Sequence, residues 1–372
     1  VAPAEGQYLP VENPATGKPY ADVAAGTAAD VDAAFAAAEQ AFPAWRDTLP
    51  ADRAAQLFRL ADALEARQDE FARAETEDTG KPLTLARRVD IPRAVRNLRF
   101  FAAAADQFAS ESHAMGRSAV NYTLRQPLGV VGCISPWNLP LYLFTWKIAP
   151  ALAAGNCVLA KPSELTPATA GLLGEVLRES AFPPGVLNIL QGEGPAVGQA
   201  IVEHPGVKAV SFTGGTATGA HIAQLVAPQF KKLSLELGGK NPTLIFADAD
   251  LDQAIPAAAR AAFTNQGEIC LCGSRLLVER TVYDRVRAAL IERTNALRVG
   301  DPLDEDTDLG ALISHDHLET VRGYLRLARE EGGTILTGGD PVAVGGRCAG
   351  GHFLQPALVE GLDAQCRTNQ EE

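Results

Sequence analysis

The spacing of apolar positions changes between the first and second quarters of the chain. In the amino-terminal part apolar residues recur every three to four positions, as in 57–64, which predicts amphipathic helices. Thr27 and Asp30 stand three residues apart before an alanine-rich stretch that runs to about Phe42. This spacing is typical of a capping box at the start of a helix. The amino-terminal region is therefore predicted to be helical.

From Gly129 onward the pattern is one of short β-branched runs separated by helical stretches. Such alternation predicts a parallel sheet with crossover helices. After Leu237 a second α/β region begins, with a strand at 275–279 and helices near 282–297 and 316–331. Residues 106–127 interrupt the plan and suggest a surface hairpin or an arm to another subunit. The β-branched runs occupy residues 130–134, 157–160, 186–190, 208–212 and 243–246.

Composition narrows the class of protein. The 372 residues allow two or three domains, and an apolar content of 47% can fill their cores. A net charge of −12 provides no broad basic surface, so we expect a small-molecule partner and no nucleic acid. Six scattered cysteines fit a reducing cytoplasm, and no His/Cys spacing suggests a metal.

Two features bear on membranes and chain ends. The uncharged residues 129–146 are interrupted by two prolines and Asn138, so we interpret them as a buried strand and a functional turn, with no membrane span. No targeting leader is visible, and the first residue is not methionine. We expect the natural chain to extend beyond residues 1–372.

A thiol, a carboxylate and an amide could together act on a carbonyl carbon. Cys270 lies in a turn bordered by Gly267 and Gly273, Glu236 ends a strand in ELGGK, and Asn138 follows Trp137 in SPWN. These residue types can supply a nucleophile, a general base and an oxyanion donor, and burial would raise the pKa of the carboxylate toward that of a base. Each also has a structural alternative: a small buried hydrophobe, a solvated strand end and a turn amide. Cys272 has either a structural role or a reversible redox link to Cys270.

Two glycine-rich segments are candidates for a phosphate site. The first, 192–198, has one residue too many for a dinucleotide fingerprint, so we interpret it as a structural turn. The second, 212–219, lets the backbone approach a ligand where Gly215 and Thr216 open a helix. An ordinary glycine turn with a threonine cap remains the alternative there.

Lys161 and Glu164 follow a strand and precede a helix, so both should lie at the carboxyl edge of the sheet. Lys161 could donate to ribose hydroxyls. Glu164 could accept from the 2′-hydroxyl and repel a 2′-phosphate, which would favour NAD over NADP. The alternative is a solvated ion pair.

Five motifs occur in the order found in the aldehyde dehydrogenase superfamily, which the chain resembles from the NPATG turn at 13–17 to its last residues: SPWN, AKPSE, FTGGTATG, ELGGKNP and NQGEIC. The resemblance implies an α/β fold with a doubly wound NAD-binding domain (1–105 and 128–237) and an oligomerisation hairpin (106–127). It also implies an α/β catalytic domain (238–372) whose last part would lie beyond residue 372. A homodimer or homotetramer is the implied assembly.

The same resemblance implies specific roles. The Cys270 thiolate attacks the aldehyde, Asn138 and the Cys270 backbone N–H hold the alkoxide, hydride passes to NAD, and Glu236 activates the water that hydrolyses the thioester. The implied cofactor contacts are Lys161, Glu164, Gly215, Thr216, Trp137 and Glu372.

Within the superfamily, segments such as 90–102 and 310–314 look most like the 2-aminomuconic semialdehyde dehydrogenases. This similarity implies that Arg93 receives a substrate carboxylate, although an ion pair with Asp90 is an alternative. Other open substrates are retinal, betaine aldehyde and aliphatic aldehydes. A cysteine hydrolase and a non-catalytic truncated homologue are the rival functions.

Overall fold

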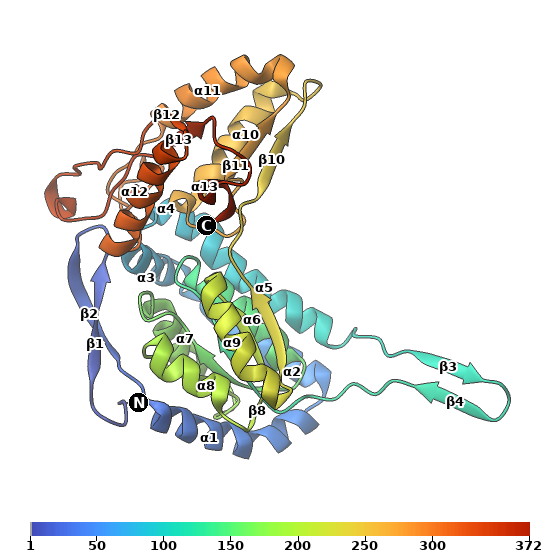
Figure 1. Cartoon of the computed structure of the whole chain (residues 1–372). Coiled ribbons are helices and arrows are strands. Elements are labelled where there is room, and N and C mark those ends of the chain that lie inside the picture. The colour runs from blue at the N-terminus through green and yellow to red at the C-terminus, as the bar shows by residue number, and fades with distance from the viewer. Residues whose placement is uncertain (1) are drawn as a thin grey trace. The chain divides into compact units, whose positions relative to one another are not determined.

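A computed structural model describes residues 2–372 and divides them into two compact units (Figure 1). The first unit contains the residues up to 9, 22–71 and 89–236, and the second contains 10–21, 72–88 and 237–372. Two segments expected in the cofactor-binding domain, 10–21 and 72–88, thus belong to the second unit. Backbone bonds explain this, because the His352 N–H donates to the Pro14 carbonyl and the Ala311 N–H donates to the Gly80 carbonyl.

The first unit is built on a parallel sheet of five strands in the order β7-β6-β5-β8-β9. All residues of β5 and β6 are buried, as expected for central strands covered on both faces. The chain runs outward from β5 to β7 and returns to β8 on the other side of β5, which creates a switch point at the carboxyl ends of β5 and β8. The predicted doubly wound α/β fold is confirmed. The strands are β5 (Val130–Ile134), β6 (Cys157–Lys161), β7 (Leu187–Ile189), β8 (Val207–Thr213) and β9 (Lys232–Glu236).

Helices precede and connect the strands of this sheet. The capping box at the start of α1 is confirmed, since the Thr27 backbone N–H donates to Asp30 Oδ2 at 2.8 Å. The segment 194–198, interpreted as a turn, is a short π-helix. The helices are α1 (Ala28–Asp47), α2 (Pro50–Ala66), α5 (Ile91–Ala105), α6 (Pro140–Ala153), α7 (Ala168–Glu179), α8 (Gln199–Glu203) and α9 (Thr216–Val226). Helix α3 (Gln68–Thr79) has residues 68–71 in the first unit and 72–79 in the second.

A two-stranded antiparallel hairpin leaves the first unit between α5 and β5 (Figure 1). It consists of β3 (Ser112–Met115) and β4 (Ala119–Tyr122), and every residue of both strands is exposed. The hairpin expected within 106–127 is therefore present.

The second unit contains two two-stranded sheets and several helices, and the sheet of β1 and β2 has residues in both units. The run at 243–246, expected to alternate with the strands of the main sheet, instead pairs in parallel with β11 in a separate sheet, since β9 ends at Glu236 and residues 237–241 form no strand. The sheets are β1 (Tyr8–Asn13) with β2 (Lys18–Ala24), β10 (Pro242–Ile245) with β11 (Arg275–Val278), and β12 (Thr334–Thr337) with β13 (Leu358–Glu360). The helices are α4 (Leu83–Leu85), α10 (Leu251–Phe263), α11 (Tyr283–Ala296), α12 (His315–Glu330) and α13 (Arg367–Gln370).

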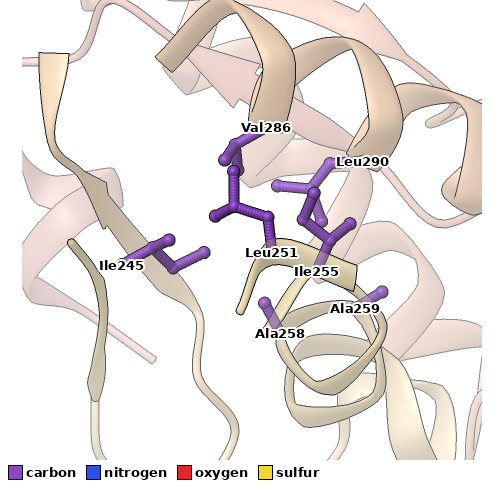
Figure 2. Close-up of a cluster of buried hydrophobic side chains, with 7 residues drawn as sticks. All are labelled: Ile245, Leu251, Ile255, Ala258, Ala259, Val286 and Leu290. Atoms are coloured by element: carbon purple, nitrogen blue, oxygen red, sulfur yellow. The ribbon is translucent and has the colours of Figure 1, made fainter. Parts of the chain in front are cut away.

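One buried cluster joins β10, α10 and α11 of this unit (Figure 2). Ile255 from α10 meets Leu290 from α11, and Ile245 from β10 completes the contact. Burial of side chains of this size contributes about 1.5–3 kcal/mol each, which makes β10, α10 and α11 a stable support for the turn that follows α10. None of the helices within residues 2–372 has the length and apolar character needed to cross a membrane.

Candidate active site

Trp137 and Asn138 lie on the bend between β5 and α6, and both are half-buried. Asn138 Oδ1 accepts a hydrogen bond from the Leu139 N–H at 3.0 Å. This bond orients the amide, so its NH₂ group is the end that can donate to a ligand. The bend follows β5 at the switch point of the sheet, where ligands bind in folds of this kind.

Arg93 lies on the first turn of α5 and is exposed. Its guanidinium carbon is 5.2 Å from the ring centroid of Tyr142, and its Nη2 donates to the Tyr142 hydroxyl at 3.4 Å. Tyr142 is on α6, one helical turn after Asn138. Arg93 is thus held beside the start of α6 with its charge at the surface.

A cavity of about 460 Å³ in the first unit has both Glu236 and Lys147 in its lining. Glu236 ends β9, an edge strand, and its side chain is exposed. The burial of Glu236 that was expected from its role as a general base is therefore absent within the first unit. Lys147 on α6 is only 5% exposed, and its Nζ donates to Ser211 Oγ at 3.1 Å. Burial lowers the pKa of Lys147 to about 8, although the charges of Cys133 and Glu236 oppose this shift.

Lys147 is not among the residues predicted from the sequence to be functional. A signal was available, because Lys147 is the one charged residue in the otherwise apolar helix α6. Lys147 is thus a buried cation in the lining of the cavity that Glu236 also lines.

Lys161 and Glu164 are brought together at the carboxyl end of β6. Lys161 is 2% exposed, and its Nζ lies 2.9 Å from Glu164 Oε2 and 2.8 Å from the Pro162 carbonyl oxygen. Burial lowers the pKa of Lys161, and the neighbouring Glu164 only partly offsets this. Burial acts to raise the pKa of Glu164, but the charge and hydrogen bond of Lys161 together with backbone N–H donors outweigh it, so the net shift is downward.

The glycine segment 192–198 has a part in this arrangement. The Gly194 backbone N–H donates to Glu164 Oε1 at 3.3 Å. Glu164 is therefore held ionised and oriented from both sides.

Gly215 and Thr216 lie exposed at the start of α9, which follows β8. A side-chain carbon built on Gly215 would meet no atom within 4 Å, so there is open space in front of this helix end. The helix N-terminus carries a partial positive charge and backbone N–H groups without helical partners, which suits a phosphate.

Cys270 lies in the turn between α10 and β11 and is half-buried. Its carbonyl oxygen accepts from Asn241 Nδ2 at 2.6 Å, and a side-chain carbon on Gly239 would lie only 2.7 Å from the same oxygen. The two motifs ELGGKNP and NQGEIC therefore meet through Gly239 and Asn241. Cys272 is buried, and burial raises the pKa of its thiol to about 11, which makes it a poor nucleophile.

Glu372 contacts the same segment between β9 and β10. Its Oε2 accepts from the Gly239 N–H at 2.7 Å. A side-chain carbon on Gly238 would lie 2.3 Å from this oxygen, so a larger residue there would displace the Glu372 carboxylate. Gly239 thus links the backbone of Cys270 to the carboxylate of Glu372 within the second unit.

The predicted site residues divide between the units. The second unit brings Cys270 and Glu372 together, and the first unit holds Arg93, Trp137, Asn138, Lys161, Glu164, Gly215, Thr216 and Glu236. The first unit also adds Lys147 beside Glu236.

Comparison with known proteins gives consistent results. Residues 1–372 match the aldehyde dehydrogenase family. The chain is 50% identical to 2-aminomuconic semialdehyde dehydrogenase of Danio rerio, covering 99% of this chain and 77% of that protein. It is 45% identical to 5-carboxymethyl-2-hydroxymuconate semialdehyde dehydrogenase of Escherichia coli, covering 99% and 79%.

A solved structure is similar as well. The crystal structure of indole-3-acetaldehyde dehydrogenase complexed with NAD⁺ superposes with a TM-score of 0.97 at 38% identity, covering 100% of this chain and 75% of that one. The chain belongs to the aldehyde dehydrogenase family. The expected activity, oxidation of a small-molecule aldehyde, is confirmed at the level of this family, as is the similarity to the 2-aminomuconic semialdehyde dehydrogenases.

Proposed function

We propose that this protein oxidises a carboxylate-bearing semialdehyde of the muconic type to the acid, with NAD as the oxidant. The observation that carries the proposal is the Cys270 turn, which Asn241 and Gly239 hold next to Glu372. The names of two relatives, both muconate semialdehyde dehydrogenases, support the substrate class.

The residues present fit NAD. The open space before Gly215 and Thr216 at the start of α9 suits a pyrophosphate, and Trp137 lies on the neighbouring bend. Lys161 and Glu164 would hold the adenosine ribose, and Glu372 the nicotinamide ribose. NAD, when bound, accepts the hydride released by the substrate.

The chain's own residues do the rest of the chemistry. The Cys270 thiolate forms a bond to the carbonyl carbon, and Asn138 and the Cys270 N–H donate to the resulting oxyanion. Loss of hydride leaves a thioester on Cys270. Glu236 takes a proton from water, which attacks the thioester, releases the acid and restores the thiol.

A further proton step involves Lys147. With a pKa near 8, Lys147 can exchange a proton at neutral pH, and it lines the same cavity as Glu236.

Arg93 is the proposed contact for the substrate carboxylate. Tyr142 holds its guanidinium by stacking and leaves most of its donors at the surface. A planar fork of this kind suits a carboxylate.

The assembly and location complete the proposal. The exposed hairpin of β3 and β4 presents unpaired strand edges, which favour pairing with a second copy in a homodimer or homotetramer. The cytoplasm is the proposed location, because six cysteines that form no disulfide suit a reducing compartment.

A panel of aldehydes assayed by NADH absorbance tests the function. We expect muconic semialdehydes to give the highest kcat/KM. Release of acid from a thioester without any NADH formation from aldehydes would indicate a cysteine hydrolase instead, and no turnover at all would indicate a non-catalytic protein.

A further inference from the structure

The residues just before Cys270 adopt an unusual backbone. Asn265 and Gln266 both have φ of 57°, and Gly267 has φ of 79°, so three consecutive residues are left-handed. Asparagine and glutamine reach this region only at an energetic cost, and such strain persists where surrounding contacts determine the conformation. The conformation of this turn therefore depends on its contacts with other parts of the second unit.

Those contacts come from the segment 310–313. Gln266 Nε2 donates to the Ala311 carbonyl oxygen at 3.2 Å, and the Gly310 N–H donates to Gln266 Oε1 at 3.4 Å. Glu268 Oε1 accepts from the Ile313 N–H at 3.0 Å. Two side chains of the turn are thus bonded to one short stretch of backbone.

This stretch is itself fixed within the second unit. A side-chain carbon on Gly310 would lie 1.8 Å from the Gly80 carbonyl oxygen, and the Leu312 N–H donates to the His352 carbonyl at 2.8 Å. The sequence of 310–314 resembles that of the semialdehyde dehydrogenases but indicates no role for the segment. Its place in the structure makes it the support of the nucleophile turn.

Glu268 is the charged residue at this support, and its side chain is only 3% exposed. We propose that Glu268 is a positioning residue whose buried side chain clamps the Cys270 turn to the backbone of 310–313. This inference rests on the proposed role of Cys270.

The groups around Glu268 favour the neutral form of its carboxyl group at pH 7. Burial raises the pKa of Glu268 to about 8, while the bonds from Ile313 and Gln266 and the charge of Lys81 oppose this shift. His317 on α12, whose Nε2 lies 3.6 Å from Glu268 Oε1, has a pKa lowered by burial. Lys81 also forms an ion pair with the buried Glu75, whose Oε1 lies 3.6 Å from Lys81 Nζ.

Neutrality matters because Glu268 is two residues from Cys270. The charge of an ionised Glu268 already acts to raise the pKa of the nearby Cys272 thiol. A negative charge here would likewise disfavour the Cys270 thiolate. A neutral carboxyl group supplies the same contacts without this electrostatic penalty.

The test is alkylation of Cys270 by iodoacetamide, followed by mass spectrometry of its peptide between pH 6.5 and 9.5. This measurement needs neither aldehyde nor NAD, so it succeeds or fails independently of dehydrogenase activity. The variants are Glu268→Gln, a neutral isostere, and Glu268→Ala. Glu330→Gln on the exposed face of α12 is the matched control.

We expect Glu268→Gln to match the wild type within about twofold at pH 7 and to react about threefold faster at pH 9, where the wild-type carboxyl group ionises. The rate of Cys270 alkylation in Glu268→Ala should differ about tenfold from the wild-type rate at pH 7, because the contact that holds the turn is lost. Superimposable profiles of wild type and Glu268→Gln through pH 9.5 would overturn the proposal. So would a wild-type rate at pH 7 in folded Glu268→Ala, or a Glu268→Gln rate at pH 7 as altered as that of Glu268→Ala. If Glu268→Ala does not fold, the Glu268→Gln profile decides alone.

Discussion

Asn241 holds the carbonyl group of Cys270. Its Nδ2 donates to the Cys270 oxygen at 2.6 Å and lies 3.3 Å from the Cys272 oxygen, so one side chain fixes both ends of the turn. Asn241 immediately precedes β10, which the buried cluster of the second unit supports (Figure 2). The position of the proposed nucleophile therefore depends on a residue that has no chemical role of its own.

Replacing Asn241 by alanine should leave the Cys270 carbonyl without this donor. Loss of a partner for a partly buried polar group costs about 1–3 kcal/mol, so kcat should fall by about 10-fold or more while the Kd for NAD changes little. Stopped-flow measurement of NADH formation and a binding titration check both values. Asn188→Ala, which removes a side-chain bond to the Gly185 carbonyl in the first unit, is the control. Equal effects of the two substitutions on kcat would show that Asn241 acts through general stability.

Cofactor preference should depend on Glu164, which Lys161 and the Gly194 N–H keep ionised. NAD should be preferred to NADP. Glu164→Gln should lower the ratio of kcat/KM for NAD to kcat/KM for NADP by about tenfold, because it removes repulsion of the 2′-phosphate. The ratio of kcat/KM for the two cofactors measures this. Glu193→Gln, on the exposed residue beside Gly194, should leave the ratio unchanged. Equal use of both cofactors by the wild type would remove the assigned role of Glu164.

Stability should depend on pH through Lys147. Its pKa of about 8 in the folded state is below the ordinary 10.5, so the unfolded chain binds more protons between these values. This group therefore makes the free energy of unfolding rise with pH from about 8 to 10.5, and lowers it below pH 8.

Lys147→Met should remove this contribution. The difference in the free energy of unfolding between variant and wild type should favour the variant most at pH 7 and shrink toward pH 10, which urea titrations at several pH values can measure. Lys208→Met, at an exposed lysine of β8, serves as the control. A difference that stays constant with pH would contradict the account of Lys147.

Arg93 should decide between classes of aldehyde. If its guanidinium receives a substrate carboxylate, Arg93→Ala should lower kcat/KM for carboxylate-bearing semialdehydes by about 10- to 100-fold and leave neutral aldehydes of similar size almost unaffected. Arg96→Ala, on the same exposed face of α5, controls for loss of charge. Equal losses for both aldehyde types would assign Arg93 a structural role.

Sequence patterns predicted the elements whose burial is uniform. The runs at 130–134 and 157–160 became β5 and β6, since a strand covered on both faces must be apolar throughout. The capping box at Thr27 was equally visible, because its two partners are three residues apart. Local spacing carries this kind of information.

Contacts between distant segments were not predictable in this way. Nothing in the sequence near residue 80 indicates that Gly80 would bind Ala311, or that Gly239 would approach Cys270. The sequence did not indicate a role for Glu268, because its burial depends on 310–313 and α12, which are more than 40 residues away. The chemical residue types were predictable from their motifs, whereas the residues that support them were not.

The central claim is that aldehyde oxidation proceeds through a thioester on Cys270 that Glu236 helps to hydrolyse. Mixing the Glu236→Ala variant with NAD and a muconic semialdehyde, then quenching within seconds for mass spectrometry, tests it most directly. We predict a burst of about one NADH per active site, followed by slow turnover, and an acyl adduct on the Cys270 peptide that is absent from Cys270→Ala. Normal steady-state turnover of Glu236→Ala without an adduct, or NADH formation by Cys270→Ala, would contradict the account.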